Sequence, residues 1–111
     1  MEIDIKKEDS AVVVSVKGRI DAVTAPEFEK ELDEIMTQGE KAFVIDFGEL
    51  DYISSAGLRS ILAITKKLKA KDGQLQLAAL KEIVKEVFDI SGFSSIIPIH
   101  ESVESALAAI E

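Results

Sequence analysis

Cysteine and tryptophan are both absent from this chain of 111 residues, and it contains a single histidine. Without thiols the chain cannot form disulfides, thiolate nucleophiles or cysteine-ligated metal sites. The one histidine, His100, would have to fold over a distant serine to build a Ser–His couple, so we interpret it as a surface or helix-start residue. Few of the residues on which hydrolytic and redox enzymes depend are therefore present.

Glycines and long apolar runs are also scarce. The six glycines stand far apart, so neither GxGxxG nor GxxxxGK[ST] phosphate-binding loops can be built from them. No apolar run approaches the ~20 residues that a membrane span requires. The first six residues lack the basic start and apolar core of a signal peptide. We expect a cytoplasmic protein that needs no cofactor.

The charge is strongly one-sided, with 21 acidic against 13 basic residues and a net charge of −8. This balance argues against nucleic acid and against direct contact with anionic membranes. It suits a partner with a basic face, although solubility alone also explains it. Hydrophobic residues make up 47% of the chain, which is enough for one folded domain over residues 1–111.

Several segments have the patterns of β-strands. Residues 1–6 and 11–18 alternate apolar with polar side chains or are rich in valine, and a short polar turn between them predicts an antiparallel hairpin. Residues 42–47 are nearly all apolar, which predicts a central strand buried on both faces. Residues 74–78 alternate, and residues 96–99 form a short strand whose proline favours a sheet edge.

Helical segments alternate with these strands. The first begins at Thr24, which we expect to form a capping box with Glu27, while Val23 and Phe28 form a hydrophobic staple across the cap. Further helices are expected from the Ser54–Ser55 pair to about residue 69, around residues 83–88, and over residues 103–110. This order predicts an α/β sandwich with about four helices and a mostly parallel sheet of four to five strands, begun by the hairpin.

Residues 52–58, Tyr-Ile-Ser-Ser-Ala-Gly-Leu, are the most informative segment. They join the central strand to the second helix, so two hydroxyl groups lie at a helix start. A helix start offers unpaired N–H groups and a partial positive charge, which can hold an anion or a phosphate attached to the serine itself. The simpler interpretation is that Ser54 or Ser55 is only an N-cap. The two roles are compatible.

Aspartates also gather where binding sites form in open α/β sheets, at the carboxyl ends of strands. We place Asp46 at the end of the central strand, Asp51 and Ser55 in the loop after it, and Asp21 in the loop after another strand. Carboxylates and hydroxyls are ligands that Mg²⁺ accepts, so a metal site is conceivable. Each of these aspartates is equally well explained as an ordinary loop or strand-end residue.

The chain resembles a known family over essentially its whole length. Residues 43–58 resemble the signature of the STAS family of bacterial anti-sigma factor antagonists, in which an apolar strand, an Asp or Asn and a short loop precede a serine or threonine that is closely followed by Gly-Leu. Residues 18–25 resemble the family's "G-x-[IL]-D-x-x-[TS]" segment. Residues 87–93 resemble its "lF-x-x-[ST]-G-[LF]" segment, and residues 103–107 match its closing helix.

The resemblance implies a regulatory protein and not an enzyme. Such proteins bind an anti-sigma factor, often a serine/threonine protein kinase, and so release its sigma factor; the kinase switches them off by phosphorylation, and a metal-dependent serine phosphatase restores them. The residue that matches the phosphoacceptor is Ser55, although many members carry aspartate where this chain has Ser54. We expect the partner to contact the residues around it: Asp21, Thr24, Asp46, Asp51, Ser54, Ala56, Gly57 and Leu58.

Three other functions stay open on the sequence alone. The chain could be a small enzyme, which turnover without partners would reveal. It could be a STAS subunit of a membrane transport or lipid-trafficking complex, which copurification with an ATPase subunit would indicate. It could also be a scaffold component of a signalling assembly, although such relatives usually carry an additional sensory domain.

Overall fold

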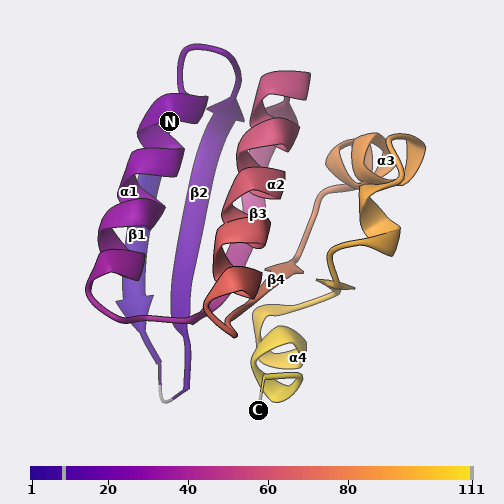
Figure 1. Ribbon diagram of the computed structural model, residues 1–111. Coiled ribbons are helices and arrows are strands. Elements are labelled where there is room, and N and C mark those ends of the chain that lie inside the picture. Colours follow the sequence, from indigo (N-terminus) through magenta and orange to yellow (C-terminus); the bar gives the residue numbers. More distant parts are fainter. Residues whose placement is uncertain (9, 111) are drawn as a thin grey trace.

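The computed structural model describes residues 1–8 and 10–110, which form a five-stranded sheet with four α-helices (Figure 1). In chain order the elements are β1 (Glu2–Lys7), β2 (Val12–Ile20), α1 (Ala25–Thr37), β3 (Ala42–Ile53), α2 (Ser55–Ala70), β4 (Gln74–Ala78), α3 (Glu82–Ile90), the 3-10 helix η1 (Phe93–Ser95), β5 (Ile99–His100) and α4 (Val103–Ala108). The mixed α/β class and the number of helices expected from the sequence are confirmed.

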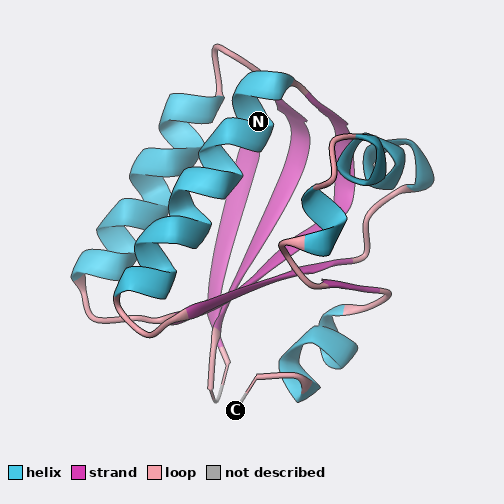
Figure 2. Cartoon of the chain, turned by 45° about the vertical axis from the view of Figure 1, so that its right-hand side comes forward, coloured by secondary structure: helices cyan, strands magenta, loops and turns pink. Residues whose placement is uncertain are grey.

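The strands lie in the sheet in the order in which they occur in the chain, β1-β2-β3-β4-β5. β1 and β2 form the expected antiparallel hairpin, and every later pair is parallel. Because each crossover advances by one strand in the same direction, α1, α2 and α3 cover the same face of the sheet, while α4 lies against the other face (Figure 2). Strand order never reverses among the described residues, so the sheet lacks the crevice in which doubly wound folds bind ligands.

Alternating side chains of β3 divide the core between the two faces. Phe43 and Ile45 belong to the large cluster under α1, α2 and α3, whereas Val44 packs in a smaller cluster with Ala106 and Ile110 of the C-terminal segment. All three β3 side chains are fully buried. The prediction that residues 42–47 are buried on both faces is thus confirmed.

β3 continues far beyond the strand that the sequence predicted, which ended at residue 47. It stays paired with β2 up to Ile20 and Ile53, and two register shifts let residues 15–20 of β2 lie beside residues 46–53 of β3. Such bulges add residues to one strand and increase its twist. The polar residues between 46 and 52 suggested a loop. Only one face of this half of β3 is covered by helices, so its polar side chains can lie on the uncovered face while Phe47, Leu50 and Ile53 are buried.

The C-terminal part differs from the expected boundaries. Residues 93–95 form the 3-10 helix, so the strand predicted over residues 96–99 reduces to Ile99–His100, paired with Leu77 and Ala78. It lies at the sheet edge, as its neighbouring proline indicated. The last helix ends at Ala108, two residues earlier than predicted. In the described part of the chain, no helix is long and apolar enough to cross a lipid bilayer.

Candidate functional site

The serine pair lies where the carboxyl ends of β2 and β3 meet the start of α2. The Ser54 N–H donates to the Ile20 carbonyl oxygen at 2.9 Å, which ties the end of β3 to the end of β2. The loop from β2 to α1 begins at the next residue, Asp21. Two connecting segments that are distant in the sequence therefore lie beside each other.

Ser54 is the N-cap of α2. Its backbone is extended (φ −94°, ψ 175°), and its hydroxyl accepts a hydrogen bond from the Gly57 N–H at 3.3 Å. Its carbonyl accepts the first intrahelical bond, from the Leu58 N–H at 3.0 Å. This is the geometry by which serine satisfies the unpaired donors of a helix start. The capping interpretation of the sequence thus applies to Ser54.

Ser55 occupies the first helical position and is exposed. Among the described residues, no hydrogen bond engages its hydroxyl. The first turn of α2 carries no acidic residue, so no nearby side chain of that turn opposes an added negative charge. Ser55 is consequently the serine of the pair whose oxygen is free to react.

Gly57 and Leu58, which the sequence suggested as partner contacts, are buried against the sheet. A Cβ atom on Gly57 would lie 2.7 Å from Ile53 Cγ1 and 2.8 Å from Ile20 Cγ2. These distances are too short for real carbon contacts, so the missing side chain lets α2 approach the strand ends. The small size of Gly57 therefore serves helix–sheet packing, and its contact with a partner stays a prediction.

The loop between β2 and α1 is held by hydrogen bonds of Asp21 and Thr24. Asp21 Oδ1 accepts from the N–H groups of Val23 and Thr24, at 3.0 and 3.1 Å. Thr24 Oγ1 accepts from the Asp21 N–H at 2.9 Å and donates to the Arg19 carbonyl at 3.0 Å. The Ala25 N–H donates to the Asp21 carbonyl at 2.8 Å. Asp21 Oδ1 and the Thr24 hydroxyl are thus engaged within the loop, while Asp21 Oδ2 lies 3.7 Å from Arg19 Nε.

This arrangement corrects the predicted start of α1. Thr24 has helical backbone angles and makes no side-chain cap bond, so the capping box with Glu27 does not form. The reciprocal bonds instead join Asp21 and Thr24, one turn earlier. The hydrophobic staple is also wrong, because Phe28 is fully buried while Val23 is 86% exposed.

Hydrogen bonding lowers the pKa of Asp21 below its usual value. The backbone N–H of Thr24 has the largest effect, the N–H of Val23 and the hydroxyl of Thr24 add to it, and Arg19 contributes through its charge, whereas partial desolvation acts in the opposite direction. The carboxylate form is the one that accepts these bonds. Asp21 is therefore a structural anion at neutral pH.

Asp51 lies on β3 itself and not in a loop, and it belongs to a row of charges at the same end of the sheet. Lys81 Nζ lies 2.6 Å from Asp51 Oδ1, and this hydrogen bond and charge lower the pKa of Asp51. Nearby, the Arg19 guanidinium stacks 4.3 Å above the Tyr52 ring. No motif marks Arg19 or Lys81, because pairing of β2 with β3 brings Arg19 to Tyr52 and the connection from β4 to α3 brings Lys81 to Asp51.

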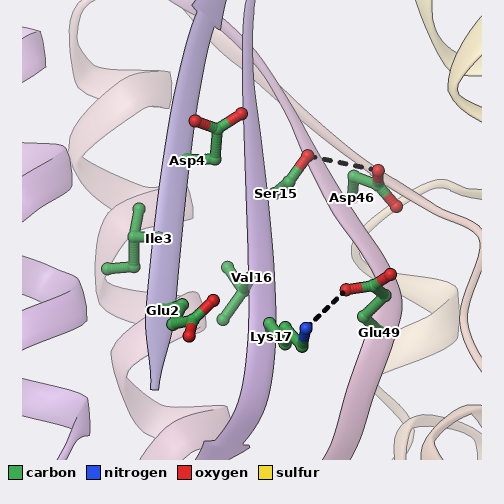
Figure 3. A pocket seen from close by; sticks show the side chains of 8 residues that line it. All are labelled: Glu2, Ile3, Asp4, Ser15, Val16, Lys17, Asp46 and Glu49. Carbon is green, nitrogen blue, oxygen red and sulfur yellow. Dashed lines mark hydrogen bonds and ion pairs between the residues drawn. The ribbon is translucent and has the colours of Figure 1, made fainter.

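Asp46 does not join this site. It lies in the middle of β3, where Oδ1 accepts from the Gly48 N–H at 2.9 Å. Its Oδ2 accepts from Ser15 Oγ at 3.2 Å, the bond that Figure 3 shows. A strand rises about 3.3 Å per residue, so Asp46 is roughly 20 Å from the end of β3 and from Ser55. Its placement at a strand end was wrong, because β3 is longer than predicted.

Neither a metal site nor a Ser–His couple is found in the part of the chain that the structure describes. No three His, Cys, Asp or Glu side chains there are grouped to hold a metal ion. His100 belongs to β5, where its Nε2 lies 2.7 Å from Gln76 Oε1. It is half-buried and not a helix-start residue.

A groove lies between α1 and α2 and begins at Ala56, the residue after the serine pair. Its volume is about 760 Å³, and its lining includes Ala22 and Ala25 from the first crossover and Ala56 and Ala63 from α2. Ala22 and Ala56 are the direct neighbours of Val23 and Ser55. The loop with Val23 and the start of α2 therefore share one continuous surface, which sequence spacing could not reveal.

The sequence is similar to known proteins along nearly its whole length. The STAS domain family matches residues 2–106. BtrV of Bordetella bronchiseptica, described as a candidate anti-sigma factor antagonist, is 42% identical over 111 residues, covering 100% of this chain and 96% of its own.

Solved structures show the same fold. An anti-sigma factor antagonist from Mycobacterium paratuberculosis superposes with a TM-score of 0.89 at 28% identity, over 98% of this chain and 92% of that one. The phosphorylated form of the Bacillus cell fate determinant SpoIIAA superposes with a TM-score of 0.75 over 96% of this chain and 97% of that one, and at 19% identity this likeness shows the fold alone. On its sequence and its fold, the chain belongs to the STAS domain family.

Proposed function

We propose that the chain is an anti-sigma factor antagonist that binds a kinase-type anti-sigma factor and so frees a sigma factor. Phosphorylation of Ser55 by the kinase switches it off, and a metal-dependent serine phosphatase reverses the modification. The chain acts by binding and not by catalysis, without contact to nucleic acid or membrane. Membership of the STAS family and the similarity to anti-sigma factor antagonists support the partner class.

The observation that carries the proposal is the difference between the two serines. Ser54 is half-buried and its hydroxyl caps α2, whereas Ser55 is exposed and its hydroxyl is unengaged in the described part of the chain. A kinase needs an accessible hydroxyl, and it can modify Ser55 without removing the cap. We therefore assign the modification to Ser55.

Electrostatics explain how the switch works without a conformational change. A phosphate adds about −1.5 to −2 charge and three acceptor oxygens. The start of α2 stabilises an exposed anion by about 0.3–1 kcal/mol, so the fold tolerates the phosphate. A partner surface that packs against the neutral serine would have to bury the dianion after phosphorylation. This lowers the affinity unless a basic side chain of the partner pairs with the phosphate.

The decisive experiment compares Ser55→Asp and Ser55→Ala. We expect Ser55→Asp to fold normally and to bind the anti-sigma factor at least ~10-fold more weakly, which corresponds to about 1.4 kcal/mol. Ser55→Ala should keep the affinity and resist the kinase. Calorimetric titration with the cognate anti-sigma factor measures binding, and mass mapping after incubation with kinase and ATP locates the phosphate.

Two results would contradict the proposal. Phosphate on Ser54 alone would show that the wrong serine is assigned. Unchanged affinity of both Ser55→Asp and the stoichiometrically phosphorylated chain would exclude the electrostatic switch and favour a role in a transport complex or a signalling scaffold.

A further inference from the structure

Val23 is more exposed than any other large apolar side chain in the described part of the chain, at 86%. A single exposed valine is common on protein surfaces and needs no explanation by itself. Its setting is unusual, because the loop that presents it is ordered by its own hydrogen bonds and lies beside the modification site.

The loop holds Val23 in place through its neighbours. The Asp21 carboxylate binds the Val23 N–H and the Thr24 N–H, and the Thr24 hydroxyl binds both the Asp21 N–H and the Arg19 carbonyl. A loop that is ordered before binding loses little conformational entropy when a partner contacts it. Because Asp21 Oδ1 and the Thr24 hydroxyl are engaged inside the loop, Val23 is the large apolar side chain that the loop presents to a partner.

The loop that carries Val23 also borders the groove that begins at the start of α2. The preceding residue, Ala22, and the residue after Ser55, Ala56, line the same groove. The Ser54 N–H bonds to the carbonyl of Ile20 at 2.9 Å, which holds the two segments together. A protein that covers the Ser55 end of this groove would therefore also meet the loop that carries Val23.

We propose that Val23 is an anchor of the complex, which the anti-sigma factor buries in an apolar pocket, and that Asp21 and Thr24 are positioning residues for it. The inference rests on the proposed function and names the contact through which that function acts. Since this chain carries a net charge of −8, we expect basic side chains around the pocket of the partner.

The test compares Val23 with Ile90, an apolar residue on α3 that is 83% exposed and lies outside the groove. Val23→Ala should weaken binding at least ~10-fold, because two methyl groups lose their pocket. Val23→Thr keeps the shape and should also weaken binding, and Val23→Asp should weaken it most. Ile90→Ala and Ile90→Asp should stay within ~2-fold of the wild type.

The probe is the purified anti-sigma factor that binds the wild-type chain in the titration above. If no anti-sigma factor binds the wild type, the proposed function itself fails. If the wild type binds and the Val23 variants bind as tightly as the Ile90 variants, the function stands and the anchor is wrong. Thermal melts show that all variants fold; a binding loss matched by a comparable loss of stability would also overturn the anchor.

The positioning role of Thr24 has its own test in a double-mutant cycle. Thr24→Val removes the hydroxyl that holds the loop, and it should weaken binding in the wild-type background but hardly at all in the Val23→Ala background. Thr24→Ser keeps the hydroxyl and should bind the anti-sigma factor as tightly as the wild type. Equal losses in both backgrounds would mean that Thr24 acts independently of Val23.

Discussion

Ser54 and Ser55 are adjacent residues, yet the helix start uses only one hydroxyl to close its hydrogen bonds. Ser54 caps the Gly57 N–H, and Ser55 projects from the first turn into solvent. The difference follows from backbone geometry, because an N-cap residue is extended while the next residue is helical. Comparing the stability of Ser54→Ala with that of Ser55→Ala therefore shows which hydroxyl caps the helix.

We expect Ser54→Ala to lower the free energy of unfolding by about 1 kcal/mol, since it leaves a donor of the helix start unpaired. Ser55→Ala is the matched control and should change it by less than about 0.5 kcal/mol. Chemical denaturation measures both. Equal losses would mean that Ser55 shares the cap, and modification would then disturb the helix.

The hydrogen bonds of Asp21 should make the stability of the fold depend on pH. The folded pKa of Asp21 is lowered, so its hydrogen bonds stabilise the fold above the unfolded pKa, and this stabilisation is lost as the pH falls through the folded value. As the pH falls below about 4, the wild type should lose stability more steeply than Asp21→Asn. A carbon-detected NMR titration should place the Asp21 midpoint below 3.8, and a midpoint above 3.8 would contradict the hydrogen-bonded loop.

At the scale of elements, the site depends on how closely α2 approaches the ends of β2 and β3. Gly57 allows this contact, and the Ser54–Ile20 hydrogen bond fixes the strand ends beneath it. The exposed Ser55 is thus supported by the buried contact of Gly57 with Ile20 and Ile53. A substitution in this contact should lower the stability of the fold and affect partner binding only as a consequence.

Gly57→Ala should lower the free energy of unfolding by about 1–2 kcal/mol, because overpacking against Ile20 and Ile53 outweighs the better helix propensity of alanine. Gly57→Val should cost more. Thermal melts measure the change, with Ser55→Ala as the control on the same helix turn. An unchanged melting temperature combined with lost partner binding would show that Gly57 is a contact residue after all.

The whole molecule carries a charge of −8, and this charge should act on the rate of association more than on the strength of any one contact. Salt shortens the Debye length from about 10 Å at 0.1 M to about 3 Å at 1 M. If the partner face is basic, its encounter with this chain should therefore depend on ionic strength.

We expect the association rate with the anti-sigma factor to fall at least ~10-fold between 50 mM and 500 mM NaCl, with a smaller change in the dissociation rate. Stopped-flow measurements with the wild type test this, and Lys66→Glu on the exposed face of α2, which makes the charge more negative, should steepen the dependence. An association rate that is independent of salt would mean that the partner presents no basic face.

Local patterns in the sequence determined the class of the fold. The apolar run at residues 42–47, the valine-rich hairpin and the helix periodicities depend on side-chain spacing, which reflects burial directly. The strand-to-helix junction with its two serines was visible for the same reason. The lack of cysteine and the wide spacing of the glycines excluded whole classes of sites, because those sites need particular residue types at particular spacings.

Only the tertiary structure decided what depends on neighbours from other parts of the chain. Pairing with β2 carries β3 on to Ile53 and moves Asp46 away from the site, and helix–sheet packing gives Gly57 its structural role. Likewise, Val23 has the sequence signature of a buried staple, yet hydrogen bonds of its own loop turn it outward. The sequence tells which side chains are apolar and how they are spaced. Which residues surround each side chain is decided only when strands and helices that are distant in the sequence pack together.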